Sequence, residues 1–484
     1  MRYFRHLLLA STAGSLFVGG AQAADLPTKK APAAPPPPTL AVCTGYQDFF
    51  TTPCKLSVAG VTLYGTIDIG VGYSTFGAPW NRDVNFSDNF LISKAGRPHV
   101  FEAAPNALSQ SNVGVSVKED FAPGWSFVGR AETGFDPFSM QLANGPESMA
   151  ENTALKLPAQ STSGDSARAG QWFNSQVYAG LASTTFGTLT FGRQNTLLLD
   201  DVNAYDPMGG SYAFSVIGFS GTTAGGGNTE DTRSNSAFKY HIDAGPFRAG
   251  ALAQVGGYAQ GNGASGLYQG ELGFDAYGFS FDAAYSYAED SVKLSTFNGT
   301  PTAAGGFPTP PTDALKATIS DDTTFQLVGK YKWNQLTLFG GYEWIQYANP
   351  SSQWATKGTP LTVLGGYYGQ NQGDAFYTPE HLQVYWTGAK YAVTPDLDAT
   401  IAYYHYNQNY YMASSTSTPC SNTSHSNCAG TLDAASALLD WRFMPKFDTY
   451  AGAMFSEVNN GLANGYQKGG HVNIDPTVGL RFRF

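Results

Sequence analysis

The stretch from Thr62 to Tyr73, TLYGTIDIGVGY, decides the fold class because apolar and polar side chains alternate along its whole length. Every second residue belongs to an apolar or small set: Leu63, Gly65, Ile67, Ile69, Val71 and Tyr73. The other set carries the polar residues Thr62, Tyr64, Thr66 and Asp68. A period of two is that of a β-strand with two different faces. The run is about twice as long as an ordinary strand, which favours a strand that crosses a membrane.

The same alternation returns at 472–484, where Leu480, Phe482 and Phe484 share the apolar face. Between these two segments, tight turns and long polar loops separate similar runs in turn, which is typical of a transmembrane barrel. The runs lie near 61–73, 108–119, 124–135, 171–183, 187–194, 233–243, 246–257, 266–277, 278–289, 323–333, 335–347, 381–393, 397–409, 431–443, 446–457 and 471–484. Their number is sixteen, which is even as a single-chain barrel requires, although the boundaries leave fourteen or eighteen open.

We therefore predict an all-β fold for residues 43–484: a transmembrane antiparallel up-and-down β-barrel of sixteen strands. Short turns would face the periplasm, and the long loops at 136–170, 195–232, 290–322 and 348–380 would face the outside. Sixteen strands enclose an aqueous channel rather than a packed core. The polar inner faces agree with a wet lumen, so the sequence predicts a water-filled pore.

The composition agrees with an outer surface that does not face water. Only 13% of the 484 residues are charged, 14% are aromatic and 56 are Gly, whereas an average protein has about 25% charged residues. The many aromatic residues and low charge density exclude a disordered chain. A coiled coil is excluded because the chain lacks the abundant Glu, Lys and Leu that are typical of one. The net charge of −10 excludes the basic balance of a nucleic-acid-binding protein.

The N-terminus predicts export from the cytoplasm. Arg2 and Arg5 precede an apolar run at 7–18 and the small-residue cleavage pattern Ala-Gln-Ala at 21–23, so we expect residues 1–23 to be a signal peptide. The apolar run is too short to span a bilayer. Residues 24–42, with four consecutive prolines, would form an extended periplasmic spacer. No later run approaches 18 apolar residues, so only a closed barrel could cross a membrane.

The four cysteines form two close pairs, Cys43 with Cys54 and Cys420 with Cys428. An even count in an exported chain predicts disulfides, each closing a short loop. The C-x-x-C spacing of a metal site is absent, and nothing supports catalytic thiols. We therefore predict no metal ion and no cofactor.

Three other functions compete with a general pore. A barrel enzyme would need a Ser/His/Asp cluster at the rim, for which His405 and the Ser-rich loop 414–426 are the available candidates. A sugar-selective channel would need an aromatic track, for which Tyr403, Tyr404 and Tyr406 are candidates. A purely structural or adhesive barrel would conduct nothing.

Several motifs, in the same order along the chain, carry a resemblance to a known family. They are Val61–Asp68, Ser111–Phe121, Glu132–Phe135, Tyr178–Leu181, Phe186–Gln194 and Val478–Phe484. The chain resembles the general diffusion porins of Gram-negative outer membranes over about residues 42–484. Its cysteine-containing entry, Cys43–Leu56, is similar to the N-terminal segment of porins from rhizobia-like bacteria.

The resemblance implies a homotrimer of barrels in the outer membrane. Its partners would be outer-membrane lipid, lipopolysaccharide and the barrel-assembly machinery, with Phe484 as the C-terminal assembly signal. The third loop would fold into each lumen and form a constriction in which acidic residues face a basic ladder. The acidic residues would be Asp200, Asp201 and Asp206, and the basic ones Arg130, Arg233 and Lys239.

The chain departs from the family where relatives often carry basic residues. Asn112 and Ser175 stand at two such positions, which thins the basic ladder. Together with the net charge of −10, this predicts a mild preference for cations. Asp321 and Asp322, in the predicted loop 290–322, are expected to be exposed and remote from the constriction.

Overall fold

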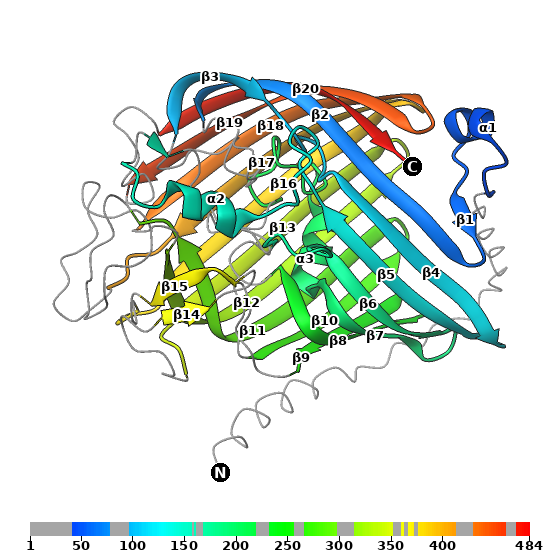
Figure 1. Cartoon of the computed structure of the whole chain (residues 1–484), viewed down its shortest axis with the longest axis horizontal. Helices are drawn as coiled ribbons and strands as arrows, with labels where there is room; N and C mark the ends of the chain where they lie inside the picture. The colour runs from blue at the N-terminus through cyan, green and yellow to red at the C-terminus, as the bar shows by residue number, and fades with distance from the viewer. Residues whose placement is uncertain are drawn as a thin grey trace, which may run out of the picture. The chain divides into compact units, whose positions relative to one another are not determined.

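The strands of this protein form one sheet that closes into a barrel (Figure 1). The computed structural model describes residues 41–77, 96–156, 159–160, 168–218, 232–255, 266–297, 314–351, 360–362, 366–371, 376–412, 429–460 and 471–484. Four of the twenty strands are short additions: β1 (Leu56–Val58), β3 (Arg97–Ala103), β14 (Pro360–Thr362) and β15 (Tyr368–Asn371). The other sixteen build the wall.

The wall strands follow one another around the ring in chain order. They are β2 (Val61–Gly77), β4 (Asn112–Ala122), β5 (Trp125–Gly134), β6 (Gln176–Ser183), β7 (Gly187–Asn195), β8 (Arg233–Ala244), β9 (Phe247–Gln254), β10 (Gly266–Ala276), β11 (Phe279–Ser295), β12 (Leu315–Trp333), β13 (Leu336–Ala348), β16 (Glu380–Thr394), β17 (Leu397–Gln408), β18 (Gly430–Met444), β19 (Phe447–Asn460) and β20 (Val472–Arg483). Each pairs antiparallel with its neighbours. The ring closes where Thr66–Gly72 of β2 pairs with Thr477–Arg483 of β20. The predicted antiparallel barrel of sixteen strands is confirmed.

The predicted alternation is also confirmed along β2. Ile67, Ile69 and Val71 are exposed on the outer surface, whereas Asp68 is fully buried on the inner side. The exposed apolar side chains of the other wall strands, among them Phe191 and Phe325, continue this outer surface. The wall therefore presents apolar side chains to a membrane and polar ones to the interior.

Two features differ from the prediction. The short strand β3 was not predicted; it pairs with Val71–Gly77 of β2, whereas β4 pairs with Val61–Thr66. The charged residues of β3 interrupt the alternation of apolar and polar side chains that would have indicated a strand. The predicted loop 290–322 is wrong at both ends, because β11 continues to Ser295 and β12 begins at Leu315. A bulge between Ala288 and Ser291 interrupts the register of this pair without ending it.

The longer strands correct a second expectation. Asp321 and Asp322 lie within β12 and are buried, with 7% and 0% of their surface exposed. Asp321 accepts a hydrogen bond from the Tyr287 hydroxyl at 3.0 Å and one from the Asp290 backbone N–H at 2.9 Å. The expectation of an exposed pair was wrong because the strand pairing extends past the predicted loop boundary.

The described helices are α1 (Tyr46–Thr51), α2 (Gly145–Asn152) and α3 (Leu197–Tyr205). None of these three is long and apolar enough to cross a membrane. The Cys43–Cys54 disulfide, predicted from the spacing, is present and closes the loop that holds α1. Cys420 and Cys428 lie outside the described residues, as do the predicted signal peptide and residues 24–40 of the predicted spacer.

The disulfide loop packs against the end of the barrel where the short turns gather. The ring of Phe49 lies 6.1 Å from that of Phe482 in an edge-to-face arrangement. The Lys446 ammonium donates a hydrogen bond to the Cys54 carbonyl at 2.7 Å. Phe482 in turn stacks on Phe484 at 5.4 Å, so the loop covers the aromatic end of β20.

Candidate functional site: the segment inside the barrel

Residues 196–218, here called the inner segment, follow β7 and pack against the inner face of the wall (Figure 1). The segment starts with α3, whose N-cap Thr196 accepts a hydrogen bond from the Leu199 backbone N–H at 3.3 Å. The backbone N–H of Leu197 donates to Gln269 Oε1 of β10 at 2.8 Å. Both contacts satisfy N–H groups that have no partner within the helix, so α3 begins at a fixed place on β10.

The C-terminal end of α3 is attached to three further strands. The Tyr205 hydroxyl lies 2.8 Å from Ser280 Oγ of β11. Trp386 Nε1 of β16 donates to the Tyr205 carbonyl at 3.2 Å, and Lys330 Nζ of β12 donates to the Ala204 carbonyl at 3.1 Å. These donors bond to carbonyls in the last turn of the helix, where the helix itself supplies no partner.

Asp206 organises the turn that follows α3. Its carboxylate accepts hydrogen bonds from the Tyr404 hydroxyl at 2.6 Å, the Gly210 backbone N–H at 2.8 Å and the Met208 backbone N–H at 3.2 Å. Only 3% of the residue is exposed, and this burial raises the pKa of the carboxyl. The structure therefore places Asp206 in the packing of the inner segment and not on an open surface.

The rest of the inner segment reaches the strands near the closure of the ring. The Ala213 backbone N–H donates to the Ala107 carbonyl at 2.9 Å, and the Tyr406 hydroxyl donates to the Val216 carbonyl at 2.6 Å. Apolar side chains fill the space beneath: Val202, Tyr205, Met208, Phe214, Ile217, Trp386, Tyr404, Tyr450 and Met454 belong to one buried cluster. The interior beside β13 and β16–β19 is thus packed.

The space on the other side of the inner segment is open. A cavity of about 230 Å³ lies between α3 and strands β5–β8. Asp200, with 47% of its side chain exposed, forms an ion pair with Lys239 there. Arg130 lines the same cavity and stands over the Tyr64 ring, 5.4 Å from its centroid.

A second cavity of about 200 Å³ lies beside the first. Arg233 and Arg168 line it together with Glu132, and Arg168 Nη1 donates to the Tyr212 hydroxyl at 3.3 Å. Of the six charged residues predicted from the sequence, Asp200, Arg130 and Lys239 share the first cavity and Arg233 lies in the second. Asp201 and Asp206 line neither.

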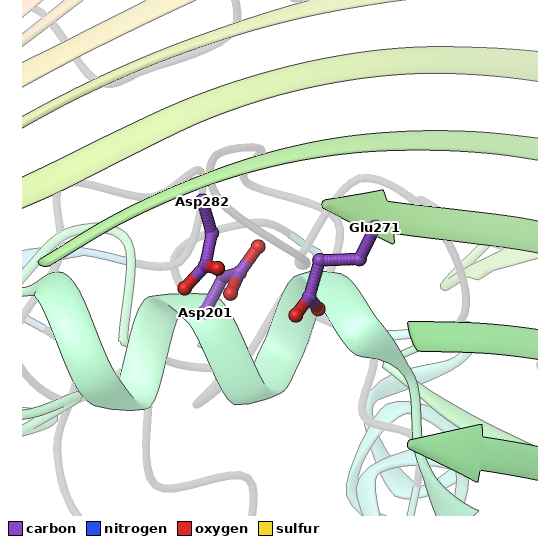
Figure 2. Close-up of side chains that lie close together, drawn as sticks. All are labelled: Asp201, Glu271 and Asp282. Carbon is purple, nitrogen blue, oxygen red and sulfur yellow. The ribbon is translucent and has the colours of Figure 1, made fainter. Parts of the chain in front are cut away.

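Asp201 faces away from these cavities and meets two carboxylates that the sequence analysis did not single out (Figure 2). Glu271 of β10 and Asp282 of β11 lie with it in a buried group whose ligand oxygens are within 4.8 Å of one another. Burial, followed by the neighbouring carboxylates, raises the pKa of Asp201. The inward parity of Glu271 and Asp282 in their strands was the available signal, but nothing in the sequence indicated which way α3 would turn Asp201.

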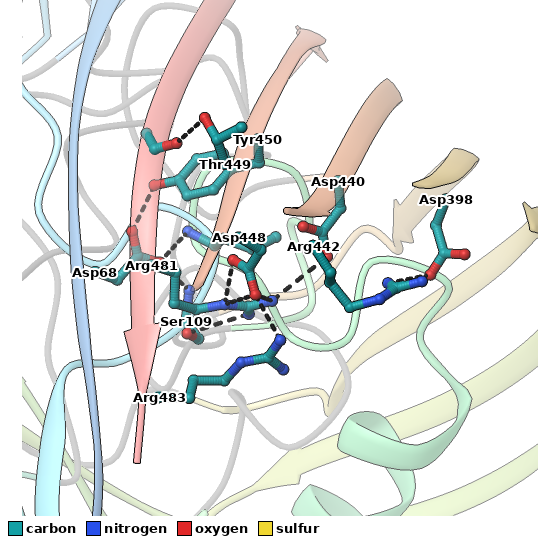
Figure 3. A network of polar contacts seen from close by, with 12 residues as sticks. Asp68, Ser109, Asp398, Asp440, Arg442, Asp448, Thr449, Tyr450, Arg481 and Arg483 are labelled. Atoms are coloured by element: carbon teal, nitrogen blue, oxygen red, sulfur yellow. Dashed lines mark hydrogen bonds and ion pairs between the residues drawn. The ribbon is translucent and has the colours of Figure 1, made fainter. Parts of the chain in front are cut away.

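A network of arginines and aspartates also went unpredicted (Figure 3). Arg481 of β20 donates through Nε to Asp448 Oδ1 at 3.0 Å, and Arg483 Nη2 lies 2.5 Å from Asp448 Oδ2. Arg442 of β18 pairs with Asp398 at 2.8 Å. The arginines at 481 and 483 alternate with apolar residues in β20, so their inward direction was predictable. Their carboxylate partners, on other strands, were not.

The residues considered for other functions are arranged differently. His405 Nδ1 lies 2.8 Å from Asp433 Oδ1, which also accepts a hydrogen bond from the Tyr403 hydroxyl; Tyr403 belongs to the exposed outer face. The Ser-rich loop 414–426 lies outside the described residues. Tyr404 and Tyr406 point inward but are buried beneath the inner segment, so they form no open aromatic track.

Comparisons with known proteins agree with this architecture. The family model for Gram-negative porins matches residues 10–461. An outer membrane porin protein of Bordetella pertussis is 28% identical over 158 residues, which are 33% of this chain and 34% of that protein. The match therefore spans about a third of the length of this curated relative.

Two solved structures have the same fold. The anion-selective porin from Comamonas acidovorans superposes with a TM-score of 0.55 at 14% identity, covering 88% of this chain and 99% of that one. OmpT, an outer membrane protein of Vibrio cholerae, gives 0.52 at 12% identity, covering 89% and 99%. The family and the curated relative indicate the outer membrane as the location. The sixteen-stranded wall and the family match over most of the sequence show that the chain belongs to the Gram-negative porin family.

Proposed function

We propose that this porin is a passive diffusion channel for small hydrophilic solutes and ions. The observation that carries the proposal is the division of the barrel interior. The inner segment is packed against β13 and β16–β19, whereas charged residues line open cavities between α3 and β5–β8. The narrowest part of the path would therefore lie between Asp200 and the wall that carries Lys239 and Arg130.

Such a path works by removing a desolvation cost. A charged solute that entered the hydrocarbon core would lose its hydration, which is expensive, whereas a polar lumen keeps most of it. The space beside Asp200 limits solute size, and the opposed charges bias ions through the local potential. Flux follows the concentration gradient, and transport requires no covalent step.

The residues around the two cavities favour anions. The described charged side chains there are four basic residues and two carboxylates: Arg130, Arg168, Arg233, Lys239, Asp200 and Glu132. The mild cation preference predicted from the sequence rested in part on the net charge of the whole chain, which includes charges far from the cavities. At physiological salt, screening acts over about 8 Å, so distant charges count little. We therefore propose a modest anion preference.

Single-channel recording in planar bilayers tests this function. Pure protein should give stable conductance steps, and the zero-current potential in a KCl gradient should have the sign of an anion-preferring pore. Protein that is folded but gives no steps above background would refute the channel. A cation-selective potential would refute the assignment of the cavities as the constriction.

Three further parts of the proposal concern assembly. The family resemblance supports a homotrimer, for which conductance should rise in triplets and the mass in mild detergent should be three times that of one chain. Outer-membrane lipid and lipopolysaccharide would cover the remaining apolar wall, and the barrel-assembly machinery would insert the chain. Removal of residues 1–23 predicts a mature chain that begins at Ala24, which N-terminal sequencing would detect.

A further inference from the structure

Three carboxylates from three different elements converge on the side of α3 that faces away from the open cavities. Asp201 comes from α3, Glu271 from β10 and Asp282 from β11, and their carboxylate groups point toward one another (Figure 2). One oxygen from each lies within 4.8 Å of the other two. All three residues are buried, with 3%, 8% and 3% of their surfaces exposed.

One oxygen of the group lacks the partner that a buried carboxylate normally has. Asp201 Oδ2 is buried and has no hydrogen-bond partner among the described residues. Leaving such a buried acceptor unsatisfied is costly, and more so when it is charged. Asp201 therefore has an unsatisfied oxygen in the group formed with Glu271 and Asp282.

Asp282 is held differently. Arg248 donates to it from Nε at 2.7 Å and from Nη2 at 2.6 Å, one bond to each carboxylate oxygen. Each oxygen keeps a second lone pair that can still bind a ligand. The arginine thus fixes the orientation of this carboxylate in the way that outer residues orient metal ligands. Among the described residues, Arg248 is the cation bonded to the group, and the more distant Lys239, which also acts on Glu271, is paired with Asp200. The three carboxylates therefore carry an excess of negative charge.

We propose that Asp201, Glu271 and Asp282 bind a calcium ion that fastens α3 to the wall at β10 and β11. Carboxylate oxygens are the ligands of hard cations such as calcium, magnesium and manganese. Two ligands on one ion lie at most twice the metal–oxygen distance apart, about 4.8 Å for calcium, so the separation of these oxygens is compatible with one shared ion. Calcium also tolerates irregular geometry, so it fits a site assembled from a helix and two strands.

The site would be built from both protein and solvent. Calcium takes about six to eight oxygen ligands, so water from the wet interior would fill the positions that the three carboxylates leave open. The ion would satisfy Asp201 Oδ2 and balance the excess charge. It would also restrain the helix that carries Asp200, so the cavity beside Lys239 would keep a constant width. Calcium binding is independent of what passes through the channel.

No metal site was predicted from the sequence, because only cysteine ligands entered that prediction. That prediction did not weigh carboxylates from separate strands, which become neighbours only when the barrel closes around α3.

Calcium binding can be measured directly on the full chain, refolded in detergent without lipopolysaccharide and freed of metal with a chelator. Titration calorimetry with CaCl₂ at neutral pH should show a single saturable site per chain, with weaker binding of MgCl₂. Glu271→Gln and Asp201→Asn should each weaken calcium binding by about tenfold or more. Asp396→Asn is the control, because it removes one exposed carboxylate from the turn between β16 and β17, outside the site, and it should bind within about twofold of wild type.

A second measurement keeps the test valid if a variant folds poorly. Calcium should raise the unfolding temperature of the wild-type barrel, since a ligand of the native state stabilises it, and should not raise that of Glu271→Gln. Saturable wild-type binding that both substitutions weaken, with Asp396→Asn unchanged, supports the site. No saturable binding by folded wild-type protein, or equal binding by Glu271→Gln, would overturn it and mean that protons neutralise the carboxylates instead.

Discussion

Replacing Asp200 by Asn removes the one carboxylate that the inner segment presents to the first cavity, and it should make the pore more anion-selective. Asp200 forms an ion pair with Lys239, and Arg130 lines the same cavity. After the substitution, the charge of Lys239 would no longer be compensated, while α3 keeps its other anchors. The change therefore adds one positive charge to the path without moving the wall.

The size of the effect follows from Coulomb's law. A unit charge acts on an ion about 7 Å away with about 0.6 kcal/mol in water. Screening at about 0.1 M salt reduces this to about 0.3 kcal/mol. Cations and anions respond in opposite directions, so their permeability ratio changes by about 0.6 kcal/mol, or roughly threefold. In a tenfold KCl gradient this corresponds to a shift in zero-current potential on the order of 20 mV.

Planar-bilayer recordings of the variant and wild type in the same gradient measure this shift. Asp396→Asn serves as the control, because Asp396 is exposed in the turn between β16 and β17. That substitution removes the same charge outside the cavities and should leave the potential unchanged. The shift from Asp200→Asn should also shrink as the salt concentration rises. Equal shifts from both variants, or no shift from Asp200→Asn, would mean that the first cavity does not limit ion passage.

Asp206→Asn should lower the free energy of unfolding by about 1–3 kcal/mol, because the amide cannot accept all the hydrogen bonds of the carboxylate. A variant that unfolds at the same urea concentration as the wild type would contradict this. Deleting Phe484, which pairs with β2 at the seam, should reduce the amount of heat-modifiable protein in the outer membrane, and normal levels would argue against an assembly role. Replacing Cys43 and Cys54 together by Ser should destabilise the N-terminal loop by about 3 kcal/mol while conductance stays normal. Faster hydrogen exchange within that loop is the readout, and unchanged exchange would show that the disulfide is dispensable.

The wall was predictable from the sequence because its signal is local. The alternation in 62–73 or 472–484 fixes the inward residues without knowledge of the partner strand, and this placed Arg130 and Lys239 correctly on the inner face. The inner segment has no such period. Asp200 and Asp201 are neighbours in α3, and the helix turns one toward the open cavity and the other toward Glu271. That difference depends on how α3 docks on β10 and β11, which is a tertiary property.

The joint between β2 and β20 has a consequence for how the barrel is made. Thr75 and Asn473, which share a hydrogen bond across it, are 398 positions apart in the chain, whereas most wall strands pair with a neighbour a short turn or a loop away. Bringing two such distant segments together in an otherwise unstructured chain would cost about 5 kcal/mol of entropy. Successive hairpins avoid most of this cost, so we expect them to form first and the joint to form last. Until then the partly built sheet has two free edges that can pair with any other extended chain. The time that these edges remain open sets the interval during which the nascent barrel needs protection from aggregation.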